Sequence, residues 1–350
     1  MRKDSPRTAV PAIVTLAVVA ALIGAGCGSS TTKAPVPAPP TGQASAGPLA
    51  TPAAAAAATP SAAHVVVIVM ENQASSDLAG NPSAPWITHA AKTYGYAANY
   101  FSVGYPSQSD YIALTSGSTQ GVFSDHPVTL DAHNIVDELE GAGLSWKAYI
   151  EGLPADKLAP SSPDGRYGRQ YDPFVSYRDI QTNPSRMANV VDLSSLAHDL
   201  QAGSLPAFAW ITPDQCHDMH GITGTGAASA AATCGFAQSR ASLIRAGDEF
   251  LATWVPRILA SPSWTPDSVL FVTWDESNGV DNQGCCDATP GGGRVLALAI
   301  TQPAVHVEST VAYNHYSLLA TVERLLGLAC LGNTCDTRNV RPMLDLLPPR

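Results

Sequence analysis

Two pairs of oxygen-bearing side chains stand directly behind apolar runs of the chain. Glu71 and Asn72 follow the run VVVIVM, and Asp275 and Glu276 follow the run VLFVTW. Such runs are typical of buried parallel strands, and the carboxyl ends of these strands form the ligand crevices of open α/β sheets. We therefore expect the four side chains to meet and to bind a divalent metal ion. Their oxygens favour Mg²⁺, Ca²⁺ or Mn²⁺.

The segment YPSQSDYIALTSG places Ser107 near the expected start of a helix. A serine in this position commonly caps the helix through its side-chain oxygen. A helix N-terminus also attracts anions, and a serine activated by a metal ion can attack phosphorus. The residues alone leave both interpretations open, and Ser109 competes with Ser107 for the second.

The segment TPDQCHDMHG is dense in side chains that bind metals or phosphate. Its residues Asp218 and His220 alternate, so both can face one direction in an extended loop, with His217 beside them. A single histidine is more often an ordinary surface or core residue, and His315, which opens the last expected helix, could be only a polar residue at a helix start. Together, Asp218, His220 and His315 form a mixed nitrogen and oxygen set, which would accept zinc or iron or bind phosphate without a metal.

The elements that must position these residues alternate along the chain. Apolar runs predict strands at 65–70, 98–101, 146–150, 207–211, 268–274 and 294–300. Helical patterns lie between them, at 86–94, 110–116, 134–142, 194–201, 239–260 and 316–326. The alternation predicts an α/β fold with a mostly parallel central sheet and helices on both faces.

The N-terminal region has the pattern of an export signal. Residues 1–26 are first basic and then apolar, and they end in small residues before Cys27. This ending resembles a bacterial lipobox, so we expect a lipid on Cys27 that anchors the protein to the outer face of the cell membrane, with plain secretion as the alternative. The Ala- and Pro-rich stretch 27–63 predicts a disordered tether, which leaves 64–350 as one catalytic domain.

Composition restricts the compartment and the partners. The formal net charge is −10 and the sequence shows no basic stripe, which excludes nucleic acid as a partner. Besides Cys27 the chain has six cysteines, an even number that fits disulfides in an exported protein. We expect the pairs Cys330–Cys335 and Cys216–Cys234, and the sequence leaves open how Cys285 and Cys286 pair.

Taken in order, the motifs resemble a known family. The chain is similar to the bacterial phosphoesterases that include acid phosphatases and phosphatidylcholine-type phospholipases C, within the alkaline phosphatase superfamily. The matching segments are VIVMEN (67–72), PSxxxYxALTSG (106–117), WxxYxE (146–151), DPF (172–174), ITP (211–213), DMH (218–220), TWDE (273–276) and HYSLL (315–319). The resemblance implies an alkaline-phosphatase-like fold and metal-dependent hydrolysis of phosphoric esters through a serine nucleophile.

The resemblance also implies roles for individual residues. Ser107 would be the nucleophile and a metal ligand, and His220 and His315 would act in catalysis. Asp218, with both histidines, would handle the phosphate or the leaving group. The four residues behind the two apolar runs would bind the metal ion, namely Glu71, Asn72, Asp275 and Glu276.

Two positions differ from the family pattern and could modify the phosphate site, together with His217. Asp110 stands where the family has an asparagine, and Tyr171 stands where it often has a histidine. The implied substrate is a small phosphomonoester or a phospholipid head group. The alternative is a non-catalytic surface lipoprotein that retains the fold, because an extra carboxylate at residue 110 would repel phosphate.

Overall fold

The computed structural model describes residues 62–279 and 281–349. The expected signal segment 1–26, the lipidation site Cys27 and the tether as far as residue 61 lie outside the described residues. No helix within the described ranges combines the length and the apolar character needed to cross a bilayer.

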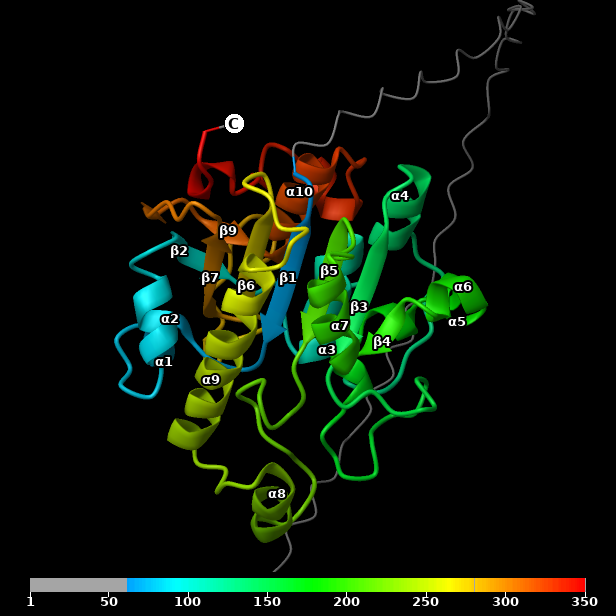
Figure 1. Ribbon diagram of the computed structural model, residues 1–350, viewed down its shortest axis with the longest axis vertical. Coiled ribbons are helices and arrows are strands. Elements are labelled where there is room, and N and C mark those ends of the chain that lie inside the picture. The colour runs from blue at the N-terminus through cyan, green and yellow to red at the C-terminus, as the bar shows by residue number, and fades with distance from the viewer. Residues whose placement is uncertain (1–61, 280, 350) are drawn as a thin grey trace, which may run out of the picture. The chain divides into compact units, whose positions relative to one another are not determined.

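Within these ranges one sheet of nine strands forms the centre of the domain (Figure 1). Its order is β4-β3-β5-β1-β6-β7-β2-β8, and β9 pairs with β2. The strands are β1 Val65–Met70, β2 Gly95–Phe101, β3 Trp146–Ile150, β4 Val190–Asp192, β5 Phe208–Thr212, β6 Val269–Trp274, β7 Arg294–Ile300, β8 Val307–Ser309 and β9 Tyr313–Asn314.

The sheet is mostly parallel, as the sequence predicted. Strand β1 lies between β5 and β6 and runs parallel to both, while β7 runs antiparallel to β6 and β2. Every residue of β1, β5 and β6 is buried, so both faces of the sheet are covered there. This burial explains the unbroken apolar runs of these strands.

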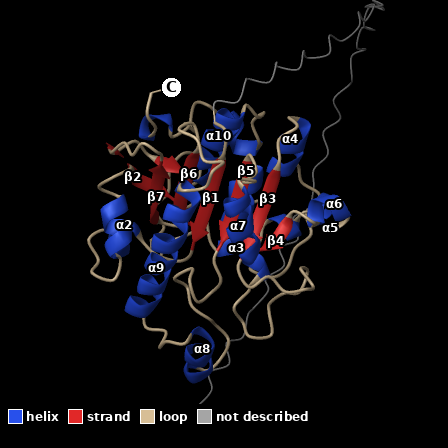
Figure 2. Ribbon diagram, viewed as in Figure 1, coloured by secondary structure: helices blue, strands red, loops and turns tan. Residues whose placement is uncertain are grey.

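Helices supply the cover (Figure 2). In Figure 1, α7 and α9 cross the face of the sheet turned towards the viewer, whereas α3 packs against α10. The helices are α1 Ser75–Leu78, α2 Pro85–Ala90, α3 Ser107–Ser116, α4 Ile135–Gly141, α5 Arg178–Gln181, α6 Pro184–Met187, α7 Ser194–Ala202, α8 Ala227–Cys234, α9 Arg240–Leu259 and α10 His315–Leu326. Short 3₁₀ turns are η1 Arg169–Tyr171, η2 Phe174–Ser176, η3 Gly332–Cys335 and η4 Leu344–Leu346.

Strand register brings the candidate residues to one edge of the sheet. Met70, at the end of β1, pairs with Trp274, at the end of β6, so the residues that follow emerge side by side. The backbone N–H of Asp275 donates to the Met70 carbonyl at 2.9 Å. From the other neighbour of β1, the loop after β5 returns to this edge, where the Glu71 N–H donates to the Asp218 carbonyl at 2.8 Å.

The described cysteines form three disulfides. Cys216–Cys234 and Cys330–Cys335 pair as the sequence indicated. The neighbouring residues Cys285 and Cys286 also pair with each other, which answers the question that the sequence left open. The Cys216–Cys234 bond closes the loop that carries Asp218.

Helix α3 begins earlier than expected. The apolar pattern predicted a start at residue 110, but the helix starts at Ser107. Its first turn is SQSD, and these four polar residues are all buried. The turn resembles a loop in sequence because its side chains bind other groups instead of packing in an apolar core.

A buried acid in α10 predicts a pH-dependent stability. The Glu323 carboxylate accepts hydrogen bonds from Leu331 N and Thr334 Oγ1, both at 2.9 Å, and burial raises its pKa to about 8 from an ordinary value of 4.5. As pH rises through this interval, the folded protein keeps a proton that the unfolded chain has lost, so the free energy of unfolding falls.

Glu323→Gln removes this titration, and it should stabilise the fold by on the order of 1–3 kcal/mol at pH 8 with little effect near pH 4.5. Urea unfolding of both proteins at the two pH values measures the difference. Parallel curves of stability against pH for the two proteins would show that another group is responsible.

Candidate active site

Five carboxylates lie close together where β1, β5 and β6 end. Glu71, Asp110, Asp218 and Asp275 are fully buried, and Glu276 is nearly so. The residues come from four separate parts of the chain, and strand register and α3 bring them together. Such a concentration of buried acids needs a physical explanation, because like charges in a dry environment repel strongly.

Ser107 lies within this cluster. Its Oγ donates a hydrogen bond to Glu71 Oε2 at 3.2 Å, and the residue is 5% exposed. Ser107 does not cap α3, because the N-cap position is Pro106 and no side chain caps the helix. Ser109 points elsewhere, since its Oγ donates to the Pro106 carbonyl at 2.8 Å. The geometry therefore distinguishes the two serines, which the sequence could not.

Tyr111 is a site residue that the sequence analysis missed. Its hydroxyl donates to Glu71 Oε1 at 2.5 Å, so Ser107 and Tyr111 bind the two oxygens of one carboxylate. The signal was present in the sequence as spacing, because residues four apart lie on the same face of a helix.

The Asn72 backbone and side chain orient the neighbouring acids. Asn72 N donates to Asp275 Oδ1 and its Nδ2 donates to Glu276 Oε1, both at 2.9 Å. The residue adopts a φ of 49°, in the left-handed region that asparagine tolerates better than most side chains. A strained conformation of this kind persists where the surrounding structure requires it.

Burial and mutual repulsion raise the pKa values of the acids. Burial raises the pKa of Glu71 well above its ordinary range, and the carboxylates of Asp275 and Asp218 raise it further. Burial likewise raises the pKa of Asp110 and Asp218. The cluster therefore requires bound protons or a cation to be stable.

The unpartnered oxygens fit a cation. Asn72 Oδ1, Asp218 Oδ2, Asp275 Oδ2 and Glu276 Oε2 are buried, and within the described ranges none has a hydrogen-bond partner. Buried acceptors without partners are costly and uncommon. A bound divalent metal ion would give such oxygens a partner, and donors of this kind suit a hard cation. By ligand spacing alone, however, the group found among the described residues is another one, Glu151, Asp214 and His217.

The loop after β5 brings His220 and Tyr171 close together. Asp218 Oδ1 accepts the His220 N–H at 2.7 Å, and the rings of His220 and Tyr171 meet edge to face with centroids 6.1 Å apart. Burial lowers the pKa of His220, whose Nδ1 lies 2.9 Å from the Gly221 carbonyl. This contact places the proton on Nδ1 and leaves Nε2 as the acceptor. Burial, with Glu71 and Asp218, raises the pKa of Tyr171, so its hydroxyl keeps its proton.

His315 meets the cluster from another side. It is fully buried at the start of α10, where Nδ1 lies 2.9 Å from Tyr100 Oη and Nε2 contacts the Asp275 carbonyl. Nε2 also lies 3.4 Å from Asp110 Oδ1, and burial lowers the pKa of His315 to about 4. The contacts of His315 are thus with Tyr100, Asp110 and Asp275, whereas His220 belongs to the loop after β5.

Asp110 is held by the loop before α3. Its Oδ1 accepts hydrogen bonds from Ser102 Oγ, Val103 N and Gly104 N at 2.8, 3.0 and 3.2 Å. These contacts give the carboxylate a role in fixing the loop that leads to Ser107. The sequence had suggested only a charge beside the phosphate.

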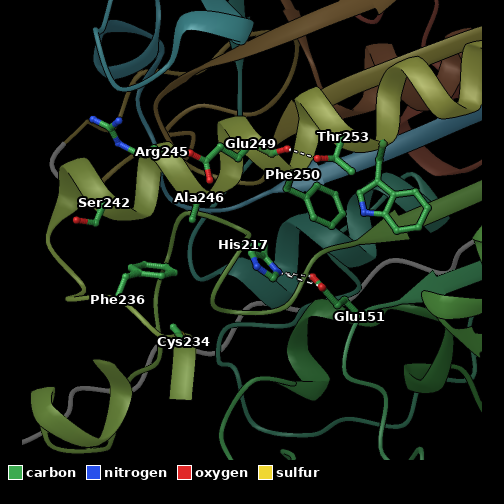
Figure 3. Close-up of a pocket in the computed structure, with 11 residues that line it drawn as sticks. Glu151, His217, Cys234, Phe236, Ser242, Arg245, Ala246, Glu249, Phe250 and Thr253 are labelled. Carbon is green, nitrogen blue, oxygen red and sulfur yellow. Dashed lines mark hydrogen bonds and ion pairs between the residues drawn. The ribbon is translucent and has the colours of Figure 1, made fainter. Parts of the chain in front are cut away.

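His217 points into a cavity of about 520 Å³, whose lining residues do not belong to the carboxylate cluster (Figure 3). Its Nδ1 lies 2.9 Å from Glu151 Oε2 and 3.3 Å from Asp214 Oδ1, and its ring stacks on Phe250. These three ionisable groups could hold a metal ion by their spacing. Burial opposes a charge on His217, but the hydrogen bonds to Asp214 and Glu151 raise its pKa to about 10, so a metal ion bound through this nitrogen would have to displace a proton. Arg166 also pairs with Asp214.

Comparison with known proteins identifies a family and several phosphatases that resemble this chain. The model of the Phosphoesterase family matches residues 81–329, a range that begins after Glu71 and Asn72. A phosphatidylinositol-3-phosphatase of Mycobacterium tuberculosis is 29% identical over 81% of this chain and 82% of its own length. A probable acid phosphatase of Kluyveromyces lactis is 24% identical over 78% of this chain, and an acid phosphatase of Aspergillus fumigatus is 23% identical over 75%. The matches span only 60% and 54% of these two fungal proteins.

Solved structures agree on the fold. A protein of the alkaline phosphatase superfamily from Vibrio parahaemolyticus superposes with a TM-score of 0.53 over 84% of this chain and 72% of its own, at 15% identity. A phosphonate monoester hydrolase from Silicibacter pomeroyi gives 0.52 over 81% of this chain and 76% of its own, at 12% identity. At these identities the likeness establishes an alkaline-phosphatase-like fold.

Gly247 of α9 should be required to position Asp218. A Cβ atom on Gly247 would lie 2.5 Å from Met219 Cγ and 2.9 Å from the His217 carbonyl oxygen, so a methyl group must displace the Met219 side chain and the His217 backbone, on the two sides of Asp218. Gly247→Ala should therefore weaken divalent-cation binding by about tenfold or more, since small displacements of ligating groups are costly.

Calorimetric titration with Mn²⁺ and Mg²⁺ measures the effect. Gly141→Ala is the matched control, because a Cβ atom at this other helical glycine meets nothing within 4 Å. Equal affinities in the two variants would show that the position of Asp218 does not matter for cation binding.

Proposed function

We propose that this chain, which belongs to the Phosphoesterase family, cleaves its substrates by attack of Ser107 on phosphorus beside a bound divalent metal ion. The family and its phosphatase relatives identify the chain as a phosphoric ester hydrolase. The metal ion, the nucleophile and the location of the enzyme are the parts that we add.

One observation carries the proposal. The Ser107 hydroxyl is hydrogen-bonded to Glu71 inside a cluster in which one oxygen each of Asp218, Asp275 and Glu276 is buried without a hydrogen-bond partner. A serine with only a structural role would cap the helix or bind the nearest backbone carbonyl, as Ser109 does. The side chains Glu71, Asn72, Asp218, Asp275 and Glu276 would hold the metal ion together with Ser107.

A bound divalent ion would lower the pKa of the serine hydroxyl and neutralise charge on the phosphoryl oxygens. Ser107 Oγ then forms a bond to phosphorus as the bond from phosphorus to the alcohol oxygen breaks. The leaving oxygen takes its proton from water, to which Ser107 gives up its own, because Tyr171 keeps its proton and the free Nε2 of His220 is an acceptor. His220 Nε2 is instead a candidate acceptor for a proton of the water that attacks next. A water molecule next hydrolyses the phosphoserine, which releases phosphate and restores the serine.

The rest of the chain keeps this geometry fixed. Tyr111 holds Glu71 from the opposite oxygen, Asn72 orients Asp275 and Glu276, and Asp110 fixes the loop before the nucleophile. His315 supports the Asp275 backbone. The oxygen donors favour Mg²⁺, Ca²⁺ or Mn²⁺, while participation of His220 Nε2 would admit Zn²⁺ or Fe.

The proposed substrate and location rest on a named relative, on the disulfides and on the motif at Cys27. A relative named as a phosphatidylinositol-3-phosphatase favours a phosphomonoester or phospholipid head group as substrate. The three disulfides fit an exported protein, and the Cys27 motif supports a lipid anchor at the membrane surface. The non-catalytic alternative has less support, because Asp110 Oδ1 is bound by neighbouring donors.

Removing the nucleophile tests the chemistry directly. Ser107→Ala should lower kcat for p-nitrophenyl phosphate by at least about 10³-fold, since no covalent route remains. Circular dichroism and thermal unfolding establish that the variant is folded. Ser109→Ala, which removes a hydroxyl two residues away, should cost far less. If Ser109→Ala is instead inactive, the nucleophile has been assigned to the wrong serine.

Removing the metal ion tests the other half of the proposal. Glu71→Gln and Asp275→Asn should each abolish turnover and tight metal binding, because each replaces a charged oxygen ligand with a neutral one. Elemental analysis of the purified proteins and turnover before and after chelation provide the measurements. Full activity in metal-free wild-type protein would overturn the proposed metal dependence.

A further inference from the structure

A cavity of about 440 Å³ lies beside the start of α3 and is distinct from the one that contains His217. Three segments form its walls, 103–109, 119–123 and 282–291. Tyr105 and Ser109 line it, on either side of the proposed nucleophile Ser107 in the chain, so the cavity lies next to the turn that carries this serine.

Hydrogen bonds fasten the walls to the catalytic machinery. Tyr105, which lines the cavity, shares a hydrogen bond of 2.7 Å with Ser277, two residues beyond Asp275. The loop after α3 is held by Asp125, whose Oδ1 accepts the Gln108 N–H at 3.1 Å in the first turn of the helix. A ligand in this cavity would therefore contact groups that are fixed relative to Ser107.

The chemical character of the cavity is neutral and largely apolar. None of its described lining residues is charged, which is unusual beside a cluster of five carboxylates. Phe123 borders the cavity and is 82% exposed, more than any other large apolar side chain among the described residues. Covering this ring with an apolar group would be favourable, because apolar surface would leave water.

In-line attack determines which part of a substrate could lie there. Ser107 approaches phosphorus from one side, so the leaving oxygen departs on the opposite side. A group that lies beside the nucleophile is therefore a substituent that phosphorus retains. A phosphomonoester has no such substituent, whereas a phosphodiester carries a second alcohol in that position.

We infer that this cavity binds the retained alcohol of a phosphodiester, and that it selects an alkyl or other apolar alcohol through Phe123. The inference rests on the proposed role of Ser107 and extends the substrate class to apolar phosphodiesters. The same inference implies that diesters with a charged retained alcohol are poor substrates, since the lining of the cavity offers no counter-charge.

Two chromogenic diesters with one leaving group test the inference. Hexyl p-nitrophenyl phosphate and ethyl p-nitrophenyl phosphate both release p-nitrophenol and differ only in the retained alcohol. The wild-type kcat/KM should favour the hexyl ester by about tenfold, less than complete burial of four methylenes would give. Phe123→Ala should reduce that preference to about threefold or less, and Phe123→Leu should restore most of it.

The monoester p-nitrophenyl phosphate separates this inference from the proposed function. In Phe123→Ala, the loss for the hexyl diester should exceed the loss for the monoester by at least about fivefold. Leu344→Ala, which truncates an exposed apolar residue in η4, is the matched control and should leave all three rates as in wild type.

Several outcomes would overturn the inference. Ser107-dependent hydrolysis of the monoester without hydrolysis of either diester refutes it and leaves the proposed function intact. An unchanged hexyl-to-ethyl ratio in Phe123→Ala also refutes it. If wild-type protein sediments with phosphatidylcholine vesicles and Phe123→Ala does not, Phe123 contacts a membrane and the cavity is not the subsite. No turnover of any of the three esters would refute both proposals.

Discussion

Repulsion among buried carboxylates is the constraint on which the site depends. Two unit charges about 5 Å apart repel by roughly 3 kcal/mol at an effective dielectric constant near 20, and this cluster has five acids. Folding must therefore either protonate them or supply a counter-charge. The fold concentrates acids where β1, β5 and β6 end, with a serine among them, which is an arrangement that a bound cation would stabilise and that catalysis can use.

The surrounding structure limits the freedom of these acids instead of neutralising them. Tyr111 and Ser107 hold the two oxygens of Glu71, and Asn72 holds Asp275 and Glu276 from its backbone and side chain. The contacts of Asn72 leave Asp275 Oδ2 and Glu276 Oε2 without a donor, whereas both oxygens of Glu71 are held. For Asp275 and Glu276 the chain thus fixes orientation through one oxygen and keeps the other available, which is the preorganisation that metal sites and charged transition states require.

Sequence patterns predicted the sheet because the physical demand on buried parallel strands is simple. Such strands must be apolar on both faces, so β1 was predicted with its observed bounds. Strand β7 is antiparallel to its neighbours but is also buried apart from Arg294, and its bounds were predicted as well. The metal-binding candidates followed, because their positions at strand ends are fixed by register. The first turn of α3 was not predicted as helix, since its buried polar residues satisfy hydrogen bonds that no periodicity reveals.

Side-chain direction was the information that the sequence lacked. His217 and Asp218 are neighbours in the chain. His217 nevertheless pairs with Glu151 in a separate cavity, whereas Asp218 faces Glu71 and Asp275. From the sequence, Asp110 was expected to be a charge next to the phosphate. In the structure its Oδ1 accepts hydrogen bonds from the backbone of the preceding loop. The role of Tyr111 depends on a four-residue spacing that becomes evident only when the register of α3 is known.

The chain order of the site has a consequence for when the enzyme can act. Its acids lie at positions 71, 110, 218, 275 and 276, and the helix that supports Asp275 begins at residue 315. The strand pairing between β1 and β6 joins residues about two hundred positions apart, a long-range contact of the kind that forms late in folding. A nascent or truncated chain that ends before β6 therefore has neither Asp275 nor the partner strand of β1. With the proposed site, hydrolytic capacity would be a property of the finished polypeptide, which would separate the synthesis of this protein from the onset of its chemistry.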